Sequence, residues 1–190
     1  MSELTDKLDA PLPSVKITCT SVACGEDLHC FLQKKQTGNL PSFGPCRACG
    51  VERVDWERAH RRDPQDIDVL FTELRQEVIR EHMWTKPFDN DAIRRASRLD
   101  RKTLLDKARK RLISSVGKPA GAWDSRQTKM EGNVIFYAQH ATATCCRKCM
   151  NYWHGINKNT HLTSEELDYC LTLIERFLDA RMPEVERVLG

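Results

Sequence analysis

The sequence has no long apolar run and no N-terminal stretch of the targeting type. Nowhere do apolar residues approach the roughly 18 consecutive positions of a membrane span. Residues 1–14, MSELTDKLDAPLPS, carry neither a basic stretch nor an apolar run of the signal-peptide kind. The composition, with 40% apolar and 30% charged residues over 190 positions, is ordinary for a folded protein. We therefore expect a cytoplasmic protein without a membrane segment, with a flexible tail over residues 1–14.

A complete set of disulfides is also excluded, because nine cysteines are an odd number. In a cytosolic chain of this size the glutathione pool keeps thiols reduced, and closely spaced cysteines more often bind metal. Metal ligation is therefore the first interpretation of each cysteine cluster.

The segment HATATCCRKCMNYWH, residues 140–154, holds three cysteines and two histidines but lacks the signatures of known zinc enzymes. It has no HExxH helix, and it lacks the His-x-Glu and Pro-Cys-x-x-Cys of the zinc deaminases. The pair Cys146 and Cys149 has the spacing of a thioredoxin-type motif, but the surrounding βαβ pattern is missing.

Metal binding remains the leading interpretation of this segment. On a helix, residues three or four positions apart share one face, so its three thiols can reach one ion. The flanking histidines can complete a Cys2His2 or Cys3His site. A redox or nucleophilic thiol and simple packing stay open, with His140 and Cys146 as catalytic candidates. The predicted ligands are His140, Cys145, Cys146, Cys149 and His154.

Residues 15–55 predict a small, zinc-ribbon-like module. In the turn CRACG, Cys46 and Cys49 can face one ion, while a small residue and Gly50 let backbone amides point at the sulfurs. Zinc can add on the order of 10 kcal/mol to the folding of so short a module. An iron-sulfur cluster is the less favoured cofactor. The predicted partner pair is Cys19 and Cys24, with Cys30 and His29 as alternatives.

Residues 56–190 predict a helical domain that contains the HATATCCRKC cluster, so the whole chain is expected to be α+β and mostly α-helical. Asp63 followed by Pro64 is a helix start, with an N-cap and a proline at the first helical position. Apolar residues then recur at helical spacing to about Trp84.

Further helices are predicted on both sides of one short strand. A second start at residues 89–90 leads to a helix that ends at Gly117 and is broken near Asp100. Residues 134–137, VIFY, form the best β-forming run, which predicts a strand that delivers His140. A capping box at Thr163 opens a last helix with Cys170 in its apolar face.

Charge is distributed unevenly along the chain. Residues 94–118 carry a net charge of +8, whereas residues 163–190 carry −4. We expect one basic face. A basic run is usually a solvated helix face, but this charge and its place beside a predicted zinc module make DNA or RNA a candidate partner. The predicted nucleic-acid-binding residues are Arg94, Arg95, Arg98, Arg101, Lys102, Arg109, Lys110 and Arg111.

The stretch RQTKMEGNVIFYAQHATATCCRKCMNYWHGI resembles the signature QTP…GHPVF-AQHATATCCR-C…WHGI of an uncharacterised family of short bacterial and phage proteins. The resemblance covers roughly residues 100–180, with the cysteine module as an added front end. Lys129 departs from a proline in the signature, and Asn133-Val134 departs from His-Pro. The resemblance supplies no activity. It implies that the family's site is formed by Gln139, His140, Thr142, Thr144, Cys145, Cys146, Arg147, Cys149, Trp153 and His154.

The favoured hypothesis is a zinc-binding protein, with one or two Zn²⁺ ions, that contacts nucleic acid through a basic helical face. A metalloenzyme is the alternative, for example a nucleic-acid-processing hydrolase whose cluster at residues 140–149 leaves one coordination position open for water. A thiol-redox protein is the third hypothesis.

Overall fold

A computed structural model describes residues 17–33, 42–123 and 128–189, so the predicted tail over residues 1–14 lies outside the described residues. This part of the chain is mostly helical, as predicted, and its β-pairing is limited to isolated bridges. No helix within it is both long and apolar enough to cross a membrane. The elements are η1 (Cys24–Glu26), α1 (Trp56–Arg61), η2 (Pro64–Asp66), α2 (Ile67–Leu74), α3 (Val78–Thr85), α4 (Asn90–Ala96), α5 (Arg101–Ser114), α6 (Ala120–Trp123), α7 (Val134–Ala141), α8 (Arg147–His154) and α9 (Ser164–Leu189).

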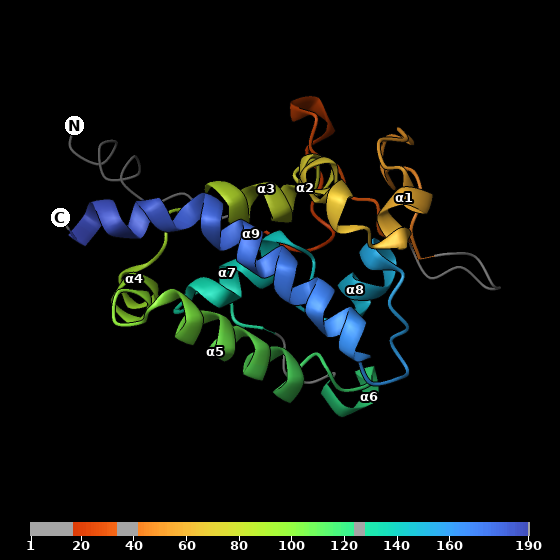
Figure 1. The fold of residues 1–190 in the computed structure, drawn as a ribbon. Coiled ribbons are helices and arrows are strands. Elements are labelled where there is room, and N and C mark those ends of the chain that lie inside the picture. Colours follow the sequence, from red (N-terminus) through yellow and green to blue (C-terminus); the bar gives the residue numbers. More distant parts are fainter. Residues whose placement is uncertain (1–16, 34–41, 124–127, 190) are drawn as a thin grey trace, which may run out of the picture.

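Helix α9 runs across the molecule and packs against both α5 and α7 (Figure 1). It begins at the predicted capping box. The Thr163 hydroxyl accepts a hydrogen bond from the Glu166 amide, and the Glu166 carboxylate accepts one from the Thr163 amide, both at 3.1 Å. Cys170 lies fully buried on the apolar face, as predicted.

The aspartates at the predicted helix starts cap helical segments. The carboxylates of Asp63, Asp89 and Asp100 each accept a hydrogen bond from a backbone amide two or three residues ahead, at 2.9, 3.0 and 2.8 Å. The break predicted near Asp100 therefore separates α4 from α5.

The helix predicted over residues 64–84 is broken between α2 and α3. At the break, Glu77 has an extended backbone, with φ −89° and ψ 134°. The His29 amide donates to the Gln76 carbonyl at 2.7 Å, and the Val78 amide donates to the His29 carbonyl at 3.4 Å. The N-terminal segment thus bonds to backbone groups that a continuous helix would have used itself.

Residues 134–137, predicted as a strand, lie in helix α7 instead. Asn133 caps this helix by accepting a hydrogen bond from the Ile135 amide at 2.9 Å. Val134, Ile135 and Tyr137 are buried in a helix that packs against α3, α4 and α9. The prediction was wrong because β-propensity mainly reflects side-chain packing, and packing on three helices decided the conformation here.

The described N-terminal residues share a hydrophobic core with the helices. Phe31 is fully buried, and its ring lies 6.2 Å from the ring of Trp56 and 6.1 Å from that of Trp153. Its amide donates to the Glu77 carboxylate at 3.3 Å. The segment that carries the first cysteines is therefore held against α1 and α8 by apolar contacts and against the N-terminal end of α3 by a hydrogen bond.

Candidate metal centres

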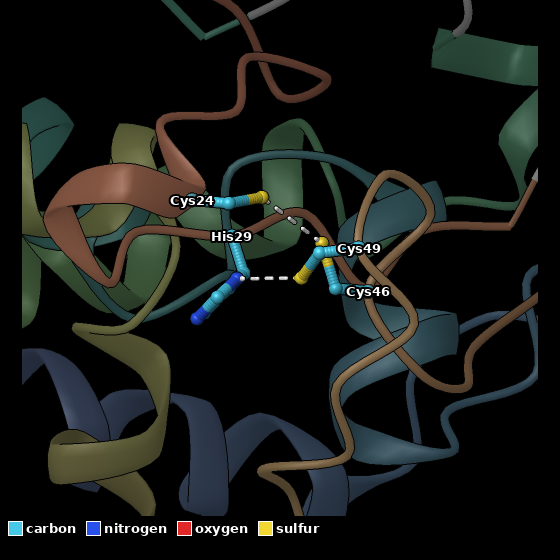
Figure 2. Close-up of side chains that lie close together, drawn as sticks. All are labelled: Cys24, His29, Cys46 and Cys49. Carbon is cyan, nitrogen blue, oxygen red and sulfur yellow. Dashed lines mark hydrogen bonds between the residues drawn. The ribbon is translucent and has the colours of Figure 1, made fainter.

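The first site consists of Cys24, His29, Cys46 and Cys49. The first two come from the segment around η1, and the last two come from the turn that follows residue 45 (Figure 2). The four ligand atoms lie within 4.8 Å of one another. The Sγ atoms of Cys24 and Cys46 are 3.8 Å apart, and the Cys49 Sγ atom is 3.6 Å from the His29 Nδ1 atom.

These separations match the edges of a tetrahedral zinc site. With bonds of about 2.3 Å to sulfur and about 2.0 Å to nitrogen, a tetrahedron has S···S edges of about 3.8 Å and S···N edges of about 3.5 Å. The measured 3.8 and 3.6 Å therefore suit one ion at the centre. Three thiolates and one imidazole form a closed set of four ligands, as in structural zinc sites.

The imidazole of His29 is oriented by a carboxylate behind it. Its Nε2 atom lies 3.1 Å from Oδ1 of Asp27, which also accepts a hydrogen bond from Arg53 at 2.9 Å. An ionised carboxylate favours the tautomer with the proton on Nε2, so the lone pair of Nδ1 faces Cys49. Zinc-binding histidines are commonly held in this way.

The turn at Cys46 has the geometry of a zinc knuckle. Gly50 has φ 77°, a left-handed conformation, and its amide donates to the Cys46 carbonyl at 2.8 Å. Burial opposes ionisation of Cys46, but backbone amide donors outweigh it and lower its pKa to about 6. Burial and then the neighbouring thiols raise the pKa of Cys24 to about 11. The crowded thiols therefore need a cation to be ionised together.

The structure brings Cys24, Cys46 and Cys49 together with His29, which the sequence offered as an alternative ligand. Cys19, predicted to share this site, is not part of the group. Cys30, the other alternative, is buried, and its thiol donates to the Cys19 carbonyl at 3.3 Å. Spacing alone did not separate these candidates, because all four N-terminal donors lie within twelve residues of one another.

The second cluster consists of Cys145, Cys146 and Cys149, whose sulfurs lie within 4.8 Å of one another. Cys146 is the N-cap of α8, and its sulfur accepts a hydrogen bond from the Cys149 amide at 3.4 Å. Contact with Cys145, together with burial, raises the pKa of Cys146 to about 12. A thiol with a raised pKa is a poor nucleophile, whereas a bound cation would ionise it, so the cluster suits a metal ion.

A buried arginine of α3 faces the second cluster. Arg80 is fully buried and donates to the Cys149 sulfur at 3.1 Å, to the Cys145 sulfur at 3.7 Å and to the His140 carbonyl at 2.6 Å. Its Nε atom donates to the Glu77 carboxylate at 3.3 Å. The guanidinium therefore places a positive charge beside the sulfurs, where it favours thiolates.

Glu77 anchors this buried network. Its carboxylate is 1% exposed and accepts hydrogen bonds from the Tyr152 hydroxyl at 2.8 Å, the Trp153 indole at 3.0 Å and the Phe31 amide at 3.3 Å. Sequence reasoning missed Glu77 and Arg80, because two opposite charges three positions apart resemble an ordinary exposed helix pair. No local signal in the sequence marked their burial.

The two histidines predicted as ligands of the second cluster bond to backbone carbonyls. The His140 Nε2 atom lies 3.1 Å from the Thr128 carbonyl, and the His154 Nε2 atom lies 2.9 Å from the Thr142 carbonyl. Burial, with a contribution from Arg80, lowers the pKa of His140 to about 4, and burial lowers that of His154 to about 3. Both rings are therefore neutral near pH 7.

The remaining polar residues of the signature hold the loop between α7 and α8. The side-chain amide of Gln139 donates to the Thr144 carbonyl at 3.1 Å, and the Thr142 hydroxyl donates to the Ala138 carbonyl at 2.8 Å. The Arg147 side chain donates to carbonyls in the segments before α6 and after α8. These bonds shape the backbone that presents the second cluster.

The predicted nucleic-acid-binding residues lie on α4, α5 and the turn between them, at the edge of the molecule opposite η1 (Figure 1). Helix α9 neutralises some of them. Arg101 pairs with Glu175 at 3.5 Å and with Asp179 at 2.5 Å, and Arg109 pairs with Asp168 at 2.5 Å. The basic and acidic segments of the sequence therefore partly face each other.

Other predicted residues differ in their exposure. Arg94 pairs with Asp91 at 2.7 Å within α4, and Arg111 is half-buried with its guanidinium 5.1 Å from the centre of the Phe136 ring. The exposed members that form no ion pair with another described residue are Arg95, Arg98, Lys102 and Lys110.

The fold and the two clusters define a mostly helical, cysteine-rich protein with side chains suited to hold metal. Residues 68–179, more than half of the chain, match the family described as "Domain of unknown function (DUF4186)". The chain belongs to this family. The matched residues include the second cluster, whereas the ligands of the first site precede them. No solved structure matches the chain.

Proposed function

We propose that this protein binds two zinc ions as fixed parts of its structure and contacts nucleic acid through the exposed basic residues of α4 and α5. The geometry of the first site carries the zinc assignment. Its sulfur and nitrogen atoms have the separations of a zinc tetrahedron, and a carboxylate lies behind its histidine. The knuckle turn at Cys46 supports the zinc-ribbon-like interpretation of residues 15–55.

Zinc fits the first site better than an iron-sulfur cluster does. Several iron atoms would hold the ligands farther apart than these atoms, which all lie within 4.8 Å of one another. Four protein ligands also leave no position for water, so the ion would stabilise the fold and would not activate a substrate.

The second cluster supports a second zinc ion for a different reason. Its thiols are close together and buried, which raises the pKa of Cys146, so a bound cation would be needed to ionise them together, and the guanidinium of Arg80 adds a positive charge beside the sulfurs. The redox alternative would need a thiol with a lowered pKa, and the raised pKa of Cys146 argues against that role.

Metal analysis of the purified full-length protein tests the zinc assignment. We expect about two equivalents of zinc, with one lost in Cys46→Ser and the other lost in Cys149→Ser. Cys170→Ser is the matched control, because Cys170 is a fully buried thiol of α9 outside both groups, and this variant should keep both ions. Full metal content in Cys46→Ser would overturn the first site.

Nucleic acid is proposed because α4 and α5 present exposed cations that form no ion pair with another described residue. Such residues can bind phosphates without giving up a bond within the protein, whereas Arg101 and Arg109 would have to leave their partners on α9. The contact surface is therefore expected to centre on Arg95, Arg98, Lys102 and Lys110.

Two double variants with equal charge change test this surface. Lys102→Ala/Lys110→Ala should weaken binding to duplex DNA and to RNA at low salt, and should reduce the salt slope by about 0.9 for each duplex phosphate that the protein no longer neutralises. Lys129→Ala/Lys158→Ala removes two exposed cations outside α4 and α5 and should retain the parent's affinity. Equal weakening in both variants, or no binding by the parent, would contradict the proposed surface.

A further inference from the structure

Cys19 lies with the second cluster, although its spacing in the sequence pairs it with Cys24. Its thiol interacts with the thiol of Cys149, more than a hundred residues further along the chain, and lies outside the group of three sulfurs that are all within 4.8 Å of one another. Cys19 is half-buried against the core, and its carbonyl accepts a hydrogen bond from the Cys30 thiol at 3.3 Å. A buried neighbour therefore fixes the backbone that carries the Cys19 sulfur.

A tight turn presents Cys19 to the second cluster. The Ser21 amide donates to the Thr18 carbonyl at 3.1 Å, and the Thr18 amide donates to the Ser21 hydroxyl at 3.0 Å. These bonds close a turn with Cys19 at its first central position. The thiol therefore projects from a defined backbone, as a metal ligand requires.

We propose that Cys19 is the fourth ligand of the second zinc ion and completes a four-thiolate site with the second cluster. The inference rests on the proposed zinc binding and deepens it. With three thiolates the site would keep one position for water, as catalytic zinc sites do, whereas a fourth thiolate closes the tetrahedron. The second site is then structural as well.

The surroundings suit the charge of such a site. A Zn²⁺ ion with four thiolates carries a net charge of −2, and the guanidinium of Arg80 donates to two of the sulfurs. The first turn of α8 adds the Cys149 amide, which donates to the Cys146 sulfur. Glu77 accepts from the Nε–H of Arg80, and the terminal nitrogens of Arg80 donate to the two sulfurs, the His140 carbonyl and the Tyr152 hydroxyl.

The site would join two parts of the chain that the family match separates. Three ligands lie inside residues 68–179, whereas Cys19 precedes them. Zinc would then fasten the N-terminal segment to the loop between α7 and α8, next to the contacts that Phe31 makes with the same core. The N-terminal segment would then be held by two zinc ions, one bound by Cys19 and the other bound by Cys24 and His29.

Cadmium-113 NMR of the full-length protein tests this ligand set, because the resonance of each bound ion moves downfield with every added thiolate. After exchange of zinc for ¹¹³Cd, we expect two resonances, one in the range of three sulfurs and one nitrogen, and one in the range of four sulfurs. Cys19→Ser should shift or abolish the four-sulfur resonance alone. Cys24→Ser should affect the other resonance alone.

The matched control is Cys30→Ser, because Cys30 is a buried thiol beside Cys19 that ligates neither ion in this assignment. Both resonances should persist in it. Cys19→His keeps a ligand at the same position and should shift the four-sulfur resonance upfield into the range of three sulfurs and one nitrogen, which keeps the test decisive if Cys19→Ser does not fold.

The outcomes separate this inference from the proposed function. A second resonance in the range of three sulfurs and one oxygen in the parent, or one that Cys19→Ser leaves in place, would overturn the role of Cys19 and leave zinc binding intact. The absence of a second metal equivalent in the parent would overturn the second zinc site itself, and the role of Cys19 with it.

Discussion

The Nε2 atom of His29 lies 3.1 Å from the Oδ1 atom of Asp27, and this contact turns the other ring nitrogen toward Cys49. Asp27 has φ 56°, a left-handed conformation that asparagine tolerates well. We therefore expect Asp27→Asn to preserve the turn and to weaken zinc binding at the first site about 10-fold, because the ring loses its charged partner. Competition with a chromophoric chelator measures this affinity.

The control for this prediction is Glu26→Gln, which removes one exposed negative charge from the neighbouring residue without touching the ring. A long-range charge effect would weaken binding equally in the two variants. Equal affinities in both would therefore mean that the hydrogen bond of Asp27 does not orient His29.

The buried pair of Arg80 and Glu77 predicts a large, non-additive effect on stability. Arg80→Met leaves a fully buried carboxylate without its cation and should lower the free energy of unfolding by about 3–5 kcal/mol. Adding Glu77→Gln to Arg80→Met should cost less than the sum of the single changes, because the uncompensated charge is removed. Urea unfolding of the three variants measures the coupling.

The exposed pair of Arg75 and Glu81 offers a comparison for that cycle. Its atoms are 2.7 Å apart, but the Arg75 side chain is 48% exposed. Arg75→Met should therefore change stability by no more than about 1 kcal/mol. A similar loss of stability in Arg75→Met and Arg80→Met would show that burial of the pair formed by Arg80 and Glu77 has no energetic consequence.

Because His154 is buried with a lowered pKa, we expect the protein to lose stability in mild acid. Its pKa in the folded protein is about 3, below the ordinary 6.5, so the unfolded chain takes up this proton first as the pH falls. Its contribution is complete above pH 6.5 and is lost as the pH falls from there toward 3. Between pH 7 and pH 5 the parent should lose about 2 kcal/mol more than His154→Gln.

Urea unfolding at the two pH values measures this difference, with zinc release followed in the same samples. His161→Gln replaces an exposed histidine and should lose as much stability as the parent does between the two pH values. An equal loss in the parent and in His154→Gln would mean that the buried ring does not titrate in this range.

His140→Gln tests the placement of the other buried histidine. Its Nε2 atom contacts the Thr128 carbonyl, so the change should lower stability by roughly 1–3 kcal/mol while both zinc ions remain bound. Thermal unfolding and metal analysis of the same sample report the two effects. Loss of one zinc equivalent without loss of helix would instead place His140 among the ligands.

Local structure could be predicted well from the sequence. The starts at Asp63, Asp89 and Asp100 and the capping box at Thr163 are all present, because a capping bond joins groups no more than three residues apart. The knuckle at residues 46–50 could be predicted for the same reason, since its glycine and its two thiols lie within a single turn.

The sequence by itself thus determined where four of the helical segments begin, that the cysteines gather in two groups and which segments are basic or acidic. Tertiary structure alone decided the rest. It made residues 134–137 helical, set Cys19 beside Cys149 and placed acids of α9 against Arg101 and Arg109. The physical reason is that packing, metal ligation and ion pairing join residues that are distant in the chain. The spacing of residues within one segment does not predict which distant residues will contact them.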